Sequence, residues 1–152
     1  MRLTLLAVGK LGPALREAAD DYLRRLRRYA EVGEIEVREA GKSPSAAEGR
    51  RQEGARLRDR LPQGALVVAL DRQGESWSSE ELAARLDGWR AGGRPVALIL
   101  GGSRGLDPDL LARATDHWSL GALTLPHQLA RVVVVEQLYR AWTILRGEPY
   151  HK

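Results

Sequence analysis

The sequence predicts an α/β fold in which helices cover a mostly parallel sheet. Two runs of consecutive apolar residues, 65–70 and 96–100, have the pattern of strands that are buried on both faces. Longer stretches between such runs repeat their apolar residues at helical spacing. Strands that alternate with helices along a chain favour a parallel sheet. Because 152 residues suit one domain and no linker or repeat interrupts them, we predict a single domain over residues 1–152.

The N-terminal part predicts a strand, a helix and a second strand. Residues 3–8 form a short, largely apolar run of the kind found in strands. Pro13 favours the start of a helix, and apolar residues at helical spacing continue to about Ala30. Ile35 and Val37 alternate with charged residues, which predicts a half-exposed strand.

Residues 44–61 predict a helix of low intrinsic stability. Gly49 and Gly54 each cost about 1 kcal/mol relative to alanine in a helix interior. Few apolar residues in this segment fall on one helical face. We therefore expect a helix that depends on its packing for stability.

The second half of the chain repeats the alternation of strands and helices. Ser78–Glu81 places capping hydroxyls ahead of a helix that we expect to end at Gly92–Gly93. The strand at 96–100 follows, and Pro108 begins a short helix. Residues 118–120 form the last predicted strand.

The last predicted helix, at about 128–146, has the least typical pattern. Val132–Val135 locally favour a strand, because β-branched side chains resist helix formation. We predict a helix because no turn signal interrupts the segment before Gly147. Its apolar residues occupy too many angles for one buried stripe, so a second face needs a partner. A symmetric homodimer would supply that partner, and burial within the same chain is the alternative.

Composition limits the classes of function. The absence of cysteine excludes disulfides, thiolate metal sites and cysteine nucleophiles. The apolar run at 3–8 is too short for a signal-peptide core or a membrane span, so we expect a soluble, cytoplasmic protein. The net charge is +4, its surplus lies in residues 1–60, and arginine far outnumbers lysine. Arginine suits an RNA partner, although a genome that favours arginine codons gives the same bias.

A glycine-rich turn at Gly101–Gly105 directly follows a predicted buried strand, where α/β sheets bind ligands. It matches neither the dinucleotide-binding fingerprint nor the P-loop. It does fit the G-x-S-x-G pattern of hydrolases, with Ser103 as nucleophile and a later aspartate and His127 in the expected order. The chain is short for that fold, and Arg104 would place a bulky cation beside the nucleophile. An ordinary tight turn is the third interpretation.

Other polar residues give weaker signals. The histidines at 117, 127 and 151 lack the spacing of metal ligands, so we predict no metal site. Glu136 and Arg140 are four residues apart on the predicted last helix, and a salt bridge between them explains both. The tail after Gly147 gathers a phenol, an imidazole and an ammonium group, although most chain ends fray.

Taken together, several segments of the chain resemble one family. The motifs T-L-P-H-Q-L and E-Q-L-Y-R-A and the P-Y-H ending are highly specific as a set. The segments that carry the resemblance are Leu70–Asp71 with Gly74, Ser78–Glu80, Leu82–Ala83, Gly101–Gly102, Gly105–Leu106, Trp118–Leu120, Leu123–Leu129, Glu136–Ala141 and Pro149–Lys152. The chain resembles the ribosomal RNA large subunit methyltransferase H family, the pseudouridine N3-methyltransferases of the SPOUT superfamily. The likeness is strong from about residue 66 and looser before it.

The resemblance implies a C-terminal trefoil knot, a homodimer, and S-adenosylmethionine held in the knot. Carried over residue by residue, the cofactor contacts fall on Leu70, Gly101, Leu120, Gly121, Ala122, Leu123, Thr124 and Leu125. Strand ends and tight turns present backbone polar groups to a ligand, and leucines cover its ring faces. Gly121 departs from the serine that is usual in the family, and a backbone contact tolerates this change.

The resemblance also implies methyl transfer to N3 of a pseudouridine in large-subunit ribosomal RNA, within the assembled ribosome. The N3 proton must leave, which requires a general base or a cation that stabilises the anion. The candidates are His127, Arg140, Tyr150 and His151, and the family suggests that the tail of one subunit lies at the other subunit's cofactor site. We expect Arg131, Arg140, Tyr150 and His151 to contact the substrate. A ribosome-binding factor without catalysis is the alternative, and it would need neither the glycine turn nor the tail.

Overall fold

Strands and helices alternate strictly in the computed structural model, which describes residues 1–42 and 44–152. The strands are β1 (Arg2–Val8), β2 (Glu31–Val37), β3 (Leu66–Ser76), β4 (Val96–Leu100) and β5 (Asp116–Ser119). The helices are α1 (Pro13–Leu26), α2 (Ala46–Asp59), α3 (Ser79–Gly92), α4 (Pro108–Ala112) and α5 (His127–Arg146). Each predicted strand and helix is present, and the predicted α/β class is confirmed.

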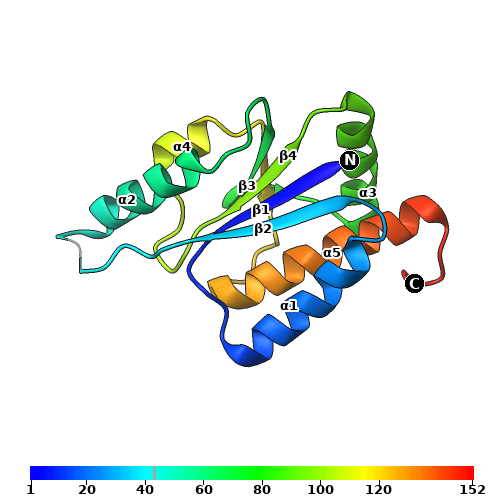
Figure 1. Ribbon diagram of the computed structural model, residues 1–152, viewed down its shortest axis with the longest axis horizontal. Coiled ribbons are helices and arrows are strands. Elements are labelled where there is room, and N and C mark those ends of the chain that lie inside the picture. The colour runs from blue at the N-terminus through cyan, green and yellow to red at the C-terminus, as the bar shows by residue number, and fades with distance from the viewer. Residues whose placement is uncertain (43) are drawn as a thin grey trace.

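The five strands form one sheet with the order β2-β1-β4-β3-β5 (Figure 1). Every pair of neighbouring strands in it is parallel. The central strands β1 and β4 carry almost only apolar side chains, because both faces of the sheet are covered there. The carboxyl ends of β3, β4 and β5 therefore lie along one edge, where ligands bind in open α/β sheets.

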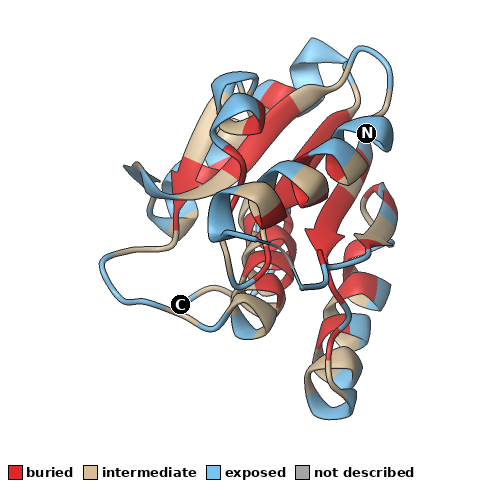
Figure 2. Cartoon of the chain, turned by 90° about the vertical axis from the view of Figure 1, so that its left-hand side faces the viewer, coloured by how far each residue is buried: buried red, intermediate tan, exposed pale blue. Residues whose placement is uncertain are grey.

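Two layers of helices cover the sheet. Alternate residues of β1 point to opposite faces, so Leu5 joins one apolar cluster and Leu6 the other. The larger cluster contains residues of α1, α3 and α5, and the smaller one contains residues of α2 and α4. Figure 2 shows buried residues along the strands and on the inward sides of the helices, with exposed residues facing outward.

Strand β3 is longer than the predicted run at 65–70 and contains a bulge. Leu70 and Glu75 both pair with Trp118 on β5, so the four residues between them loop out of the ladder. A β-carbon on Gly74 would collide with the backbone carbonyl of His117, so only glycine fits there. The bulge places Asp71 at the end of the regular ladder, beside the pocket described below.

Helix α5 forms through Val132–Val135 as predicted, and it packs against both α1 and α3. This packing outweighs the local preference of valine for a strand. Val134 and Val135 are fully buried within the chain, whereas Leu129 is 38 % exposed. Burial within one chain thus accounts for most of the apolar surface of α5. No helix in residues 1–42 and 44–152 combines the length and apolar character that a membrane crossing requires.

Candidate functional site at the carboxyl ends of the strands

A pocket of about 490 Å³ lies where β3, β4 and β5 end. Its volume is in the range of small-molecule sites. Its lining comes from β3 at the start of its bulge, the turn after β4, the end of β5 with the loop after it, and the start of α5: Leu70–Arg72, Leu100–Leu106, Trp118–Gly121, Leu123–His127 and Ala130. The wall is therefore built mainly from loops that the sheet and α5 hold in place.

The turn after β4 is tight and rich in glycine, and all five of its residues line the pocket. Gly102 and Gly105 form an isolated bridge, and Gly105 has a φ of 79°, which favours glycine. A β-carbon on Gly101 would lie 2.6 Å from the carbonyl carbon of Gly105. Larger residues at position 101 would force this turn open, so the tight shape depends on glycine.

Seven of the eight residues predicted to bind the cofactor line this one pocket, although they come from three separate segments. They are Leu70, Gly101, Leu120, Gly121, Leu123, Thr124 and Leu125. Ala122 is exposed and is not part of the lining. Leu123 is 81 % exposed, an unusual position for a leucine in a free chain.

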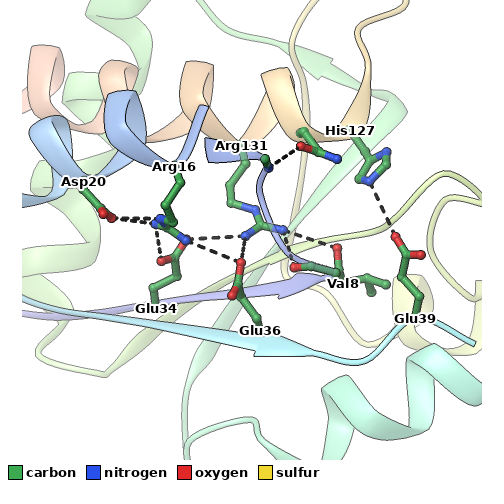
Figure 3. Close-up of polar contacts among 11 residues, drawn as sticks. Val8, Arg16, Asp20, Glu34, Glu36, Glu39, His127 and Arg131 are labelled. Carbon is green, nitrogen blue, oxygen red and sulfur yellow. Dashed lines mark hydrogen bonds and ion pairs between the residues drawn. The ribbon is translucent and has the colours of Figure 1, made fainter. Parts of the chain in front are cut away.

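His127, the first residue of α5, also lines the pocket. Its Nε2 lies 3.8 Å from Oε1 of Glu39, and the helix directs the ring toward that carboxylate (Figure 3). Asp71 lines another part of the pocket, and its Oδ2 lies 3.2 Å from Nδ1 of His117, which is not itself a lining residue. Sequence reasoning missed Asp71 as a pocket residue, although its place directly after a buried strand is a usable signal.

The hydrolase interpretation fails on these contacts. Ser103 is exposed, and within the described part of the chain no hydrogen bond joins it to a histidine. His117 and His127 face the carboxylates of Asp71 and Glu39 instead. The same described residues include no group of three or more histidines and carboxylates that could hold a metal ion.

Arg131 occupies a different position from the one expected of a substrate contact. Its side chain is 2 % exposed and forms ion pairs with Glu34 and Glu36 of β2 (Figure 3). Its Nη2 donates to the backbone carbonyls of Val8 and Gly9, at 3.3 and 2.8 Å. The guanidinium is thus bound inside the protein, which does not fit the predicted contact of Arg131 with the substrate.

Arg140, Tyr150 and His151 come together around Glu136 on α5. Oε1 of Glu136 accepts hydrogen bonds from Nη2 of Arg140 at 2.6 Å and from the Tyr150 hydroxyl at 3.0 Å. Nη1 of Arg140 lies 3.1 Å from Nδ1 of His151, whose Nε2 lies 2.7 Å from Oε1 of Glu80 on α3. The predicted salt bridge between Glu136 and Arg140 is present, and the tail is held in place by these contacts.

The tail cluster lies far from the pocket of its own chain. His127 begins α5, and the tail leaves the helix after Arg146, its last residue. A helix of 20 residues is about 30 Å long at 1.5 Å per residue. None of Arg140, Tyr150 and His151 lines the pocket. One chain therefore presents two separate groups of predicted site residues, at opposite ends of α5 (Figure 1).

Hydrogen bonds in and near the tail shift several pKa values. Burial and hydrogen bonds to Tyr22 and Glu136 raise the pKa of Tyr150. Burial and a 2.5 Å hydrogen bond to Glu148 raise the pKa of Tyr29 to about 12. A hydrogen bond to His151 lowers the pKa of Glu80. The neutral phenols and the Glu80 carboxylate are thus the forms that the folded tail favours.

We expect Tyr29 and Tyr150 to ionise at a higher pH than free tyrosine, whose pKa is about 10. The folded pKa values are raised, so the hydrogen bonds stabilise the tail below pH 10 and are lost as the pH rises through the folded values. Absorbance at 295 nm should show a step near pH 12 that Tyr29→Phe removes. Circular dichroism at each pH controls for unfolding, and an unchanged curve in the variant would contradict the assignment.

The sequence is similar to known methyltransferases over almost its whole length. A family profile described as "Predicted SPOUT methyltransferase" matches residues 1–151. The protein named "Ribosomal RNA large subunit methyltransferase H" from Chromohalobacter salexigens is 47% identical over 100% of both chains. The protein of the same name from Rubrobacter xylanophilus is 53% identical over 99% of this chain and 98% of its own.

Solved structures share the fold at low identity. A probable methylase family protein from Haemophilus influenzae matches 99% of this chain and 70% of its own, with a TM-score of 0.58 and 16% identity. The SpoU methyltransferase AviRb from Streptomyces viridochromogenes, in complex with the cofactor AdoMet, matches 94% of this chain and 61% of its own, with a TM-score of 0.52 and 15% identity. At these identities the likeness concerns the fold alone.

Proposed function

The chain belongs to the SPOUT methyltransferase family, and from this we propose that it transfers the methyl group of S-adenosylmethionine to N3 of a pseudouridine in large-subunit ribosomal RNA. The relatives' shared name gives the rRNA substrate class. The assembled ribosome is the proposed substrate, and the cytoplasm is the proposed location. The observation that carries the proposal is the convergence of three separate segments on one pocket.

The pocket has the chemistry that S-adenosylmethionine requires. Tight turns at Gly101 and Gly121 expose backbone N–H and C=O groups that can bind the polar parts of a nucleoside. Leu70, Leu120 and Leu125 supply apolar surface for the adenine ring. When bound, the cofactor supplies an activated methyl group on a sulfonium centre. The protein must then hold the RNA base in line with that group and exclude water.

A homodimer would bring the tail of one subunit to the pocket of the other. The length of α5 keeps the tail from its own pocket. Among the described residues, the exposed large apolar side chains are Leu123 and Leu129. Leu123 lines the pocket, and Leu129 is in the first turn of α5 beside it. A second copy that covers them would bury apolar surface and supply Arg140, Tyr150 and His151 together.

His127 at the pocket and the tail cluster of a second subunit together have the properties needed to handle the N3 proton. Methyl transfer would break the bond from the sulfonium sulfur to the methyl group, release S-adenosylhomocysteine and form a bond to N3, so the proton on N3 must pass to a general base. His127 lines the pocket and faces Glu39, an arrangement that suits a base. Arg140 is permanently charged and can stabilise the N3 anion. Tyr150 and His151 would contact the target pseudouridine once it has flipped out of the RNA base stack.

A calorimetric titration with S-adenosylhomocysteine tests the proposed function first. We expect binding in the micromolar range, or about −8 kcal/mol. Intact ribosomes that lack the modification should then accept tritiated methyl groups from S-adenosylmethionine, at a site located by nuclease digestion. Free 23S rRNA serves as the comparison substrate. Absence of S-adenosylhomocysteine binding and of methyl transfer would leave a non-catalytic ribosome-binding factor as the better interpretation.

A further inference from the structure

Helix α2 carries a buried carboxylate close to the glycine turn. The side chain of Glu53 is 3 % exposed. Its Oε2 accepts a hydrogen bond from the backbone N–H of Ala40 at 2.9 Å and another from Nη1 of Arg104 at 3.2 Å. Its Oε1 is buried without a hydrogen-bond partner in the described part of the chain. A buried charge is costly unless it is paired. The Glu53 carboxylate is therefore much more stable when its ion pair with Arg104 is formed.

Arg104 connects this carboxylate to the pocket. It belongs to the turn Gly101–Gly105 and lines the pocket, whereas no residue of α2 does. Its guanidinium also donates to the backbone carbonyls of Ala40 and Gly41, at 3.2 and 3.3 Å. Rotation of Arg104 away from Glu53 would break several bonds at once, so the turn is held to the body of the protein through this side chain.

The two glycines that weaken α2 allow this close approach. A β-carbon on Gly49 would lie 2.8 Å from both Cδ and Nε of Arg104. A β-carbon on Gly54 would lie 2.8 Å from Cβ of Asp107, just after the turn. Gly88 in α3, by contrast, has nothing within 4 Å of its β-carbon position. The low helix propensity of α2 is therefore linked to its contact with the segment that shapes the pocket.

We propose that Glu53 is a positioning residue for methyl transfer: through Arg104 it holds the turn Gly101–Gly105 in the shape that binds the cofactor. The inference rests on the proposed function and adds α2 to the site. Glu53 acts without touching the cofactor, so its removal should change cofactor affinity while the fold is retained.

The test compares S-adenosylhomocysteine binding by calorimetry in the full-length wild type, Glu53→Gln, Arg104→Met and the double variant. Glutamine keeps the acceptor for the N–H of Ala40 and removes the charge that faces Arg104. We expect the Kd of each single variant to rise about tenfold or more, as for the loss of one charged hydrogen bond. The double variant should bind no more weakly than the weaker single variant, because both changes break the same contact.

Glycine substitutions supply a matched pair of controls. Gly49→Ala displaces Arg104 but keeps both charges, so we expect a raised Kd although alanine favours the helix. Gly88→Ala adds the same methyl group to a helix where space is open, so we expect an unchanged Kd and a raised Tm. If Glu53→Gln fails to fold, the Kd values of Gly49→Ala and Gly88→Ala still test the proposal: a raised Kd in Gly49→Ala alone supports it, and equal Kd values contradict it.

Two results would overturn the positioning role of Glu53. One is wild-type affinity in a folded Glu53→Gln variant, and the other is additive effects of Glu53→Gln and Arg104→Met. A wild-type protein that does not bind S-adenosylhomocysteine at all would instead overturn the proposed function. The two failures are therefore distinguishable in one set of titrations.

Discussion

A chain that ends after Glu148 is expected to lose methylation and still bind S-adenosylhomocysteine. The missing residues include Tyr150 and His151, which the structure groups with Arg140 at the far end of α5 from the pocket. The loss of proton handling alone should slow the reaction by about 10²–10⁴-fold. Tritiated methyl transfer to ribosomes measures the rate, and calorimetry measures cofactor binding.

Two controls make this result specific. Removal of Lys152 alone keeps Tyr150 and His151 and should leave the rate unchanged. Mixing the shortened chain with a Gly101→Val chain should restore activity, because only a mixed dimer pairs an intact pocket with an intact tail. Full activity in the shortened chain would exclude a role for the tail, and a lack of restoration on mixing would contradict its action across the dimer.

Arg131→Met should cost about 3–5 kcal/mol of unfolding free energy, measured by urea denaturation. The substitution removes the cation that pairs with Glu34 and Glu36 and the donor to two backbone carbonyls. Oε2 of Glu34 is buried and has the Arg131 guanidinium 3.6 Å away. Glu34 would keep its ion pair with Arg16, whose Nη2 lies 2.6 Å from Oε1, but its buried Oε2 would lose the Arg131 cation.

Arg24→Met is the matched control for this effect. Arg24 also pairs with a carboxylate, that of Asp21, but its side chain is 72 % exposed. Exposed ion pairs contribute at most about 1 kcal/mol, so this variant should unfold at nearly the wild-type urea concentration. Equal stability losses in the two variants would show that burial of Arg131 is not the cause.

The fold was largely predictable because its signals are local. Apolar runs such as 96–100 indicate buried strands regardless of where their partners lie. Even Val132–Val135, whose propensity favours a strand, could be assigned to a helix from the absence of a nearby turn. The ends of elements were less accurate: β2 begins at Glu31, before the predicted Ile35, and α1 ends at Leu26, before Ala30. The turn after Leu26 ends α1, and pairing with β1 extends the edge strand β2 back to Glu31.

The roles of single polar residues were harder to predict, because their partners are distant in the sequence. Arg131 lies about a hundred positions after Glu34 and Glu36, and no spacing rule links them. Gly49 weakens a helix by its propensity, and only the structure shows Arg104 against it. The pocket residues, by contrast, follow from the family motifs, because those motifs carry information about contacts that one sequence alone does not contain.

The interior place of β1, between β2 and β4 in the sheet, has a consequence for synthesis on the ribosome. β1 can pair with β2 once about the first 40 residues are available, but its other edge must wait for β4, which begins at Val96. At 5–20 residues per second, that interval of 59 residues between Val37 and Val96 lasts about 3–12 s. During this time an apolar strand has an unpaired edge, which is a site for aggregation. The nascent chain is therefore expected to need a chaperone's protection in that interval more than at any later stage.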